Sequence, residues 1–184
     1  GRVLDDDGVV LLRFNSGAQG TLQASQISIG EENSLKLRVY GETASIEWSQ
    51  LEPNSVWIKY ADKPSQLIRA GVGEMDAVTM ANMRTPAGHP EGYLEAFANI
   101  YTQFSYQIRD KLFPRNNNQT TDDLVTINNE AMHDVPGIES AIRGMAFIEN
   151  VVAASQSELK WHKFSLAPKN IVISPNPSNE LNKA

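Results

Sequence analysis

The residue best suited to chemistry is His89, which follows a turn-rich segment and precedes a long amphipathic pattern. Pro90 fits the first position of a helix, and Glu91 would complement the positive helix end. Apolar residues then recur in steps of three and four, the spacing of one helix face, at Tyr93, Phe97, Ile100, Phe104, Ile108 and Leu112. We predict a helix over residues 90–111 with His89 as its N-cap. Because a helix N-terminus favours the neutral imidazole, His89 could either cap the helix or face a ligand.

The remaining candidates for chemistry are weaker. His133 and His162 do not stand at metal-ligand spacing from His89 or from a close carboxylate pair, so we predict no metal site. The Gly71-Val72-Gly73 segment resembles part of a dinucleotide fingerprint, but Asp76 occupies the place of its third glycine. The sequence contains no cysteine, and no Ser-His-Asp order or carboxylate pair can be assigned. We therefore predict no catalytic residue in this chain.

Charge and composition restrict the partners. The 184 residues carry a net charge of −6 without a basic run, which argues against nucleic acid and acidic membrane surfaces. No apolar run approaches the length of a membrane span, and the first residues lack the blocks of a signal peptide. Together with the absence of cysteine, this pattern is compatible with a cytoplasmic protein.

Alternating apolar and polar residues between positions 8 and 70 predict consecutive strands joined by short turns. The strands are expected at 8–14, 20–27, 34–40, 44–48, 56–60 and 66–70, followed by segment 71–84 without a clear period. Strands without helical crossovers form antiparallel sheets.

The second half of the chain adds a second helix and a closing strand. After a polar loop at 114–129, a helix is predicted over 137–156. Its apolar residues recur at helical spacing, at Ile138, Ile142, Met145, Ile148 and Val152. Residues 159–164 are expected to form the last strand. The predicted fold is α+β, with a large, mainly antiparallel open sheet and two main helices packed on one face. Residues 1–166 form this domain, and residues 167–184 form a loosely packed or disordered tail.

Six segments in order resemble the C-terminal domain of the Gfo/Idh/MocA oxidoreductases. They are Asp6 to Phe14, Asn15 to Leu22 (NSGAQGTL), Leu35 to Gly41 (LKLRVYG), Ala44 to Trp48 (ASIEW), Gly88 to Tyr93 (GHPEGY) and Arg143 to Glu149 (RGMAFIE). Trp161 fits the final strand of that domain. The resemblance covers about residues 5–165.

The resemblance implies a parent enzyme with an N-terminal Rossmann domain that holds NAD or NADP. The catalytic lysine and its assisting residues would lie in parts of the parent outside this chain. This chain would then line the substrate pocket and mediate assembly, as a homodimer or higher homo-oligomer through its sheet. The implied substrate is a sugar, inositol or related polyol, and no cofactor is expected in this chain.

Three residues are implied to be near the substrate. His89 matches the GHPEGY segment that opens near the cavity, and the turn from Ser28 to Asn33 matches a loop that borders it. Gln26 stands where many relatives have arginine, which leaves the charge of the substrate open. An alternative is a dimerisation or scaffold module with the same fold and without redox chemistry. A glycine-rich strand-to-helix turn elsewhere in the parent would favour the enzyme.

Overall fold

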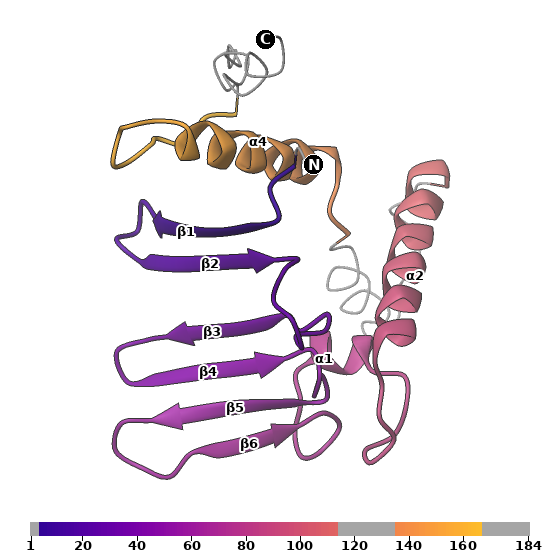
Figure 1. Ribbon diagram of the computed structural model, residues 1–184. Coiled ribbons are helices and arrows are strands. Elements are labelled where there is room, and N and C mark those ends of the chain that lie inside the picture. The colour runs from indigo at the N-terminus through magenta and orange to yellow at the C-terminus, as the bar shows by residue number, and fades with distance from the viewer. Residues whose placement is uncertain (1–3, 114–134, 167–184) are drawn as a thin grey trace, which may run out of the picture. The chain divides into compact units, whose positions relative to one another are not determined.

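The computed structural model of the protein describes residues 4–113 and 135–166 (Figure 1). The chain divides into two compact units, one of residues 1–27 and 136–184 and the other of residues 28–135. The predicted loop at 114–129, His133 and the tail at 167–184 lie outside the described residues.

The first unit contains a β-hairpin. Strand β1 (Asp7–Arg13) pairs antiparallel with β2 (Gln19–Ser25), with Val10 opposite Leu22. The connecting turn closes by backbone hydrogen bonds from Phe14 to Ala18 and from Gly17 to Phe14. Gly17 adopts a φ of 92°, a conformation that favours glycine, which explains why the Asn-Ser-Gly signal predicted this turn correctly.

Helix α4 (Ile138–Ser155) of the same unit confirms the helix predicted at 137–156. The face that it buries differs from the expected one. Ala146 is only 4% exposed, whereas the residues expected to form the core stripe remain largely exposed at Ile138, Ile142, Met145 and Ile148. The helix is apolar on more than one side, so helical spacing alone did not identify the buried side.

The predicted strand at 159–164 is wrong, because these residues form no strand and pair with none in the described part of the chain. Asn150 of α4 holds this segment instead. Its side-chain amide donates to the Ser165 carbonyl at 2.8 Å, and its side-chain oxygen accepts from the Ser165 backbone N–H at 3.2 Å. The guanidinium of Arg13 also lies 3.9 Å from the ring centre of Trp161. The side chain of Asn150 therefore binds the backbone of this segment in the way that a neighbouring strand would.

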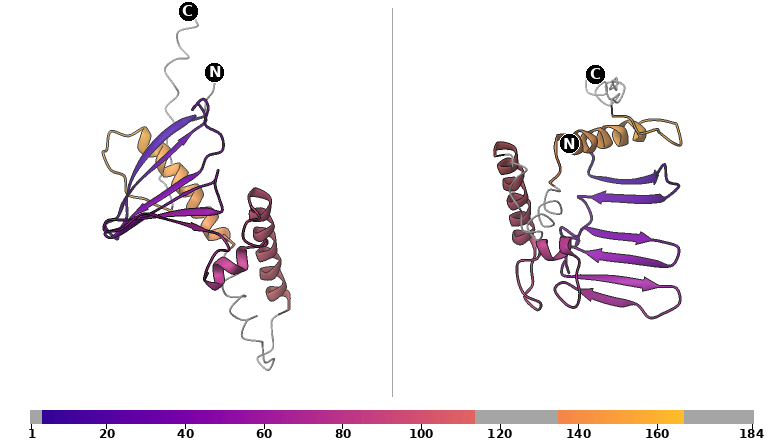
Figure 2. Two further views of the ribbon diagram at one scale, coloured as in Figure 1. Left: turned by 90° about the horizontal axis from the view of Figure 1, so that it is seen from below. Right: turned by 180° about the vertical axis from the view of Figure 1, so that it is seen from behind.

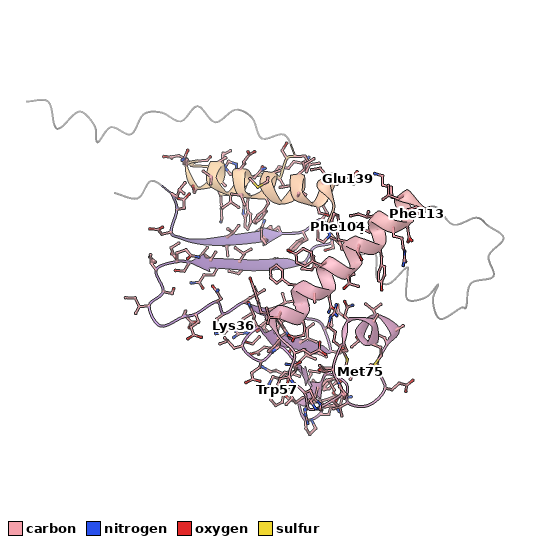
Figure 3. All side chains as sticks on the ribbon, turned by 90° about the vertical axis from the view of Figure 1, so that its right-hand side faces the viewer. Lys36, Trp57, Met75, Phe104, Phe113 and Glu139 are labelled. Carbon is pink, nitrogen blue, oxygen red and sulfur yellow. The ribbon has the colours of Figure 1, made fainter. Side chains whose placement is uncertain are left out.

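The second unit contains a four-stranded antiparallel sheet of β3 (Lys36–Tyr40), β4 (Ala44–Ser49), β5 (Ser55–Tyr60) and β6 (Gln66–Arg69), in that order. The register gives the sheet one apolar face, with Leu37, Val39, Ile46, Ile58 and Ile68. The opposite face is mixed and includes Lys36 and Trp57 (Figure 3). There Glu47 forms ion pairs with Arg38 and Lys59.

Two helices of this unit lie beyond one end of the strands (Figures 1 and 2). Helix α1 (Ala77–Asn82) was not predicted, although its N-cap signal is present: the Asp76 carboxylate accepts from the Thr79 backbone N–H at 2.9 Å. Helix α2 (Tyr93–Leu112) begins three residues after the predicted start. In its apolar stripe, Phe97 is 41% exposed and Phe104 is 50% exposed.

The α+β class and the antiparallel pairing are confirmed. Within the described residues, β1 and β2 form one sheet and β3 to β6 form another. Residues between Gln26 and Leu35 connect these sheets without a ladder hydrogen bond. The helices α2 and α4 belong to different units, and the segment that carries His89 belongs to the unit of the four-stranded sheet.

Candidate functional site

The segment between α1 and α2 is held by the carboxylate of Glu91. Its Oε1 atom accepts hydrogen bonds from the backbone N–H groups of Arg84 and Thr85, both at 2.6 Å, and from the Thr85 hydroxyl at 2.9 Å. The Thr85 hydroxyl also lies 3.0 Å from the His89 carbonyl oxygen. Glu91 therefore closes residues 84–91 into a compact loop. The sequence had suggested a different role, in which Glu91 complements the positive helix end.

Asn54 fastens this loop to the sheet. Its side-chain amide donates to the Glu91 carbonyl at 2.7 Å, and its side-chain oxygen accepts from the Glu91 backbone N–H at 3.1 Å. The two residues are 37 positions apart in the sequence. One asparagine thus satisfies both backbone groups of Glu91, in the way that a neighbouring strand would.

The loop and the sheet line an open cavity of about 230 Å³. Its polar walls come from the turn before β5, the end of β6 and the loop, and include Glu52, Ser55, Arg69 and His89. Ser55 and Arg69 stand opposite each other in the β5–β6 pairing. All of the lining residues belong to the second unit. The volume lies just below the roughly 300–1,000 Å³ of sites for drug-sized ligands, so it suits a small molecule.

His89 lines this cavity but does not cap α2, so the predicted N-cap is wrong. Gly92 is the N-cap, and the Glu95 carboxylate accepts from its backbone N–H at 2.8 Å. The Nδ1 atom of His89 instead lies 3.2 Å from the Pro86 carbonyl oxygen. A carbonyl can only accept, so this contact is a hydrogen bond when Nδ1 carries the hydrogen, and in that tautomer Nε2 is an acceptor.

The other predicted site residues are not brought to this cavity. Asn33 is exposed in the loop before β3 and is absent from the lining. Gln26 belongs to the first unit, where its backbone N–H donates to the Asp6 carbonyl at 2.7 Å. His162 lies in the segment without regular secondary structure that follows α4. Among these candidates, only His89 lines the cavity.

A second cavity, also of about 230 Å³, lies between α1 and α2. The guanidinium of Arg84 donates to Asn99 at 2.8 Å and to Thr102 at 3.0 Å. The Asn99 amide donates to the Asn82 carbonyl at 2.7 Å, and the Gln103 amide donates to the Asn82 side chain at 2.9 Å. These polar groups already satisfy one another, so this cluster joins the two helices.

Over residues 4–113 and 135–166, no group of three or more His, Asp or Glu side chains is arranged to hold a metal ion. Within the same ranges, no helix combines the length and apolar character that crossing a bilayer requires.

The fold and the motifs agree with comparisons to known proteins. The family described as "Oxidoreductase family, C-terminal alpha/beta domain" (GFO_IDH_MocA_C) matches residues 1–162. The chain therefore belongs to the Gfo/Idh/MocA oxidoreductase family and contains its C-terminal α/β domain. This result confirms the resemblance that the six sequence segments indicated.

Among individual proteins, the chain is similar to the uncharacterized oxidoreductase YfiI of Bacillus subtilis. The two are 33% identical over 161 residues, which are 88% of this chain and 38% of YfiI. An oxidoreductase structure from Sinorhizobium meliloti matches with a TM-score of 0.71 and 33% identity, over 88% of this chain and 42% of that one. The chain thus spans less than half the length of these relatives.

A structure of an inositol dehydrogenase homologue from Azotobacter vinelandii, complexed with NADH and myo-inositol, has the same fold. Its TM-score is 0.68 at 24% identity, over 83% of this chain and 38% of that one. At this identity the similarity establishes the fold alone.

Sequence reasoning did not single out Glu52 or Arg69. A partial signal existed, because a hairpin of the strands predicted at 56–60 and 66–70 brings the start of one beside the end of the other. Ser55 opposite Arg69 is this arrangement. No local pattern showed that His89 would lie at the same end of the sheet.

The Glu91 carboxylate makes the loop sensitive to acid. Burial raises the pKa of Glu91, but the hydrogen bonds from Thr85 and Arg84 lower it more, so the net pKa lies below its usual value of 4.5. The stabilisation is therefore complete above pH 4.5 and is lost as the pH falls through the folded-state pKa. In an NMR titration, the amide signals of Arg84 and Thr85 should shift below pH 4.5.

The matched variant is Glu91→Gln, which keeps an acceptor oxygen but removes the charge. We expect this variant to abolish the acid transition of the two amides and to lower the free energy of unfolding by about 1 kcal/mol, since the group is partly solvated. Unchanged amide titration in the variant would assign the transition to another carboxylate.

Proposed function

We propose that this chain is the substrate-side and oligomerisation domain of an NAD(P)-dependent dehydrogenase that acts on a sugar, inositol or related polyol. Family membership supports an oxidoreductase parent. The observation that carries the substrate-side role is the polar cavity beside His89, whose Nε2 atom is an acceptor for a hydroxyl hydrogen. Gln26 and Asn33 remain proposed substrate contacts in the parent.

The proposed chemistry is divided between this chain and the rest of its parent. A Rossmann domain of the parent would bind NAD or NADP and provide the catalytic lysine, and the cofactor would accept hydride from a carbinol carbon. This chain would bind and orient the polyol, with His89 accepting a hydrogen bond from one hydroxyl. We propose a cytoplasmic location for the enzyme, in keeping with the absence of cysteine from these 184 residues.

The test compares this chain with its full-length parent. The parent should reduce NAD or NADP with a polyol. The chain alone should not catalyse this reaction and should not bind NADH in a calorimetric titration. Micromolar NADH binding by the chain alone would contradict the division of roles. A parent that binds neither cofactor would favour the alternative, a non-catalytic dimerisation or scaffold module with this fold.

We also propose that the parent self-associates through the four-stranded sheet. Each face keeps large apolar side chains exposed: Leu37 is 55% and Val39 is 49% exposed on one face, and Trp57 is 43% exposed on the other. Exposed apolar faces of this kind commonly mediate assembly. We expect a homodimer or higher oligomer whose interface buries at least roughly 1,000 Å². Light scattering that gives a monomer at high protein concentration would refute this.

A further inference from the structure

Three polar groups of the residues that line the cavity take no part in holding the loop. They are the side chains of Glu52 and Arg69 and the Nε2 atom of His89. Three other groups already hold the loop: the Glu91 carboxylate, the Asn54 amide and the Thr85 hydroxyl. By contrast, Glu52 and Arg69 form no ion pair within 4 Å in the described part of the chain. Both residues line the cavity together with His89, whose Nδ1 atom lies against the Pro86 carbonyl oxygen.

We propose that Arg69 and Glu52 bind the ligand of this cavity and that the ligand is an uncharged molecule with neighbouring hydroxyl groups. This inference rests on the proposed function and extends it to two residues and to the charge of the ligand. Each hydroxyl can donate one hydrogen bond and accept others, whereas Arg69 only donates and ionised Glu52 only accepts. A diol satisfies both groups at once and donates its next hydroxyl to His89.

The charge balance of the cavity selects against an anion. A lone arginine would favour a carboxylate or phosphate, because its guanidinium binds such groups with two parallel hydrogen bonds. Here Glu52 places a compensating negative charge on the wall of the same cavity. An anionic ligand would gain attraction from Arg69 and lose it by repulsion from Glu52, whereas a neutral diol has no such penalty.

The rigid wall of the cavity supports binding by preorganisation. The Asn54 clamp fixes the loop that carries His89, and the β5–β6 ladder fixes Arg69 opposite Ser55. The ligand therefore orders only the side chains of Arg69 and Glu52, which limits the entropic cost of binding.

The experiment titrates the isotope-labelled chain with myo-inositol, with cyclohexanol as a probe without neighbouring hydroxyls and with D-glucuronate as an anionic probe. Chemical shifts of the His89 ring nitrogens and of the Arg69 side chain report binding at the cavity. We expect myo-inositol to shift both residues and cyclohexanol to shift neither. Stronger binding of glucuronate than of myo-inositol would overturn the inference that the ligand is uncharged.

Variants test the two residues separately. Arg69→Gln and Glu52→Gln should each weaken myo-inositol binding about tenfold, the loss expected for one hydrogen bond to a charged group. Arg69→Lys should retain part of the affinity. The control is Arg38→Gln, which removes a cation from the same sheet outside the cavity. Equal affinity in Arg69→Gln, Glu52→Gln and the unaltered chain would refute the proposal.

Kinetics of the full-length parent distinguish this inference from the proposed function. If the parent oxidises a polyol and His89→Asn raises its KM while Arg69→Gln and Glu52→Gln do not, the dehydrogenase function stands and the roles of Arg69 and Glu52 fall. If the parent oxidises no polyol but the chain binds myo-inositol through Arg69 and Glu52, the binding site stands and the dehydrogenase function falls.

Discussion

Replacing Gly71 by alanine should lower the free energy of unfolding by about 3 kcal/mol. Gly71 has a φ of +73°, a conformation that costs a residue with a Cβ atom roughly 1–2 kcal/mol. An added Cβ would also lie 2.7 Å from Met83 Cε and 3.3 Å from the backbone of Ala87. The methionine end can move, but the Ala87 backbone belongs to the loop that carries His89, so overpacking adds about 1–3 kcal/mol.

Gly73 provides the matched control. Its φ of +83° is similar, yet no atom lies within 4 Å of a Cβ built on it. Gly73→Ala should therefore pay the backbone cost alone, and urea unfolding should separate the two variants by about 1–2 kcal/mol. Equal losses in the two variants would mean that the loop does not pack against Gly71 in solution. Shifts in the amide signal of His89 should accompany Gly71→Ala only.

Replacing Asn54 by aspartate should release the loop from the sheet. The substitution keeps the acceptor for the Glu91 N–H but removes the donor to the Glu91 carbonyl, and it places two oxygen atoms opposite each other where the bond now measures 2.7 Å. An unpaired, partly buried carbonyl facing a carboxylate costs about 2–3 kcal/mol. Asn54→Ala should cost about 1–2 kcal/mol, because it removes both hydrogen bonds without adding repulsion.

Amide hydrogen exchange measures this release directly. The Glu91 N–H should lose its protection in both Asn54 variants, and ligand shifts at His89 should weaken with it. Asn33→Asp is the control, since Asn33 is exposed in the same unit and lies away from the cavity. Retained protection of the Glu91 N–H in Asn54→Asp would show that other contacts hold the loop.

The amino-acid sequence by itself determined the six strands between residues 7 and 69, the helix at 138–155 and the family. Alternation of apolar and polar residues is a local property, so the strand bounds agree with the structure to within about two residues, as for Ala44–Ser49. The turn at Gly17 was equally predictable, because a positive φ favours glycine. The GHPEGY segment directed attention to the loop that lines the cavity.

Only the tertiary structure decided where α2 begins, which side of α4 is buried and which residues accompany His89. Asn54 and Asn150 each satisfy the N–H and carbonyl of a distant residue, Glu91 and Ser165, in place of a strand or a helix turn. Such bonds join positions that no local period relates. The Asn54 bonds hold the loop that carries His89 beside the cavity that Arg69 also lines.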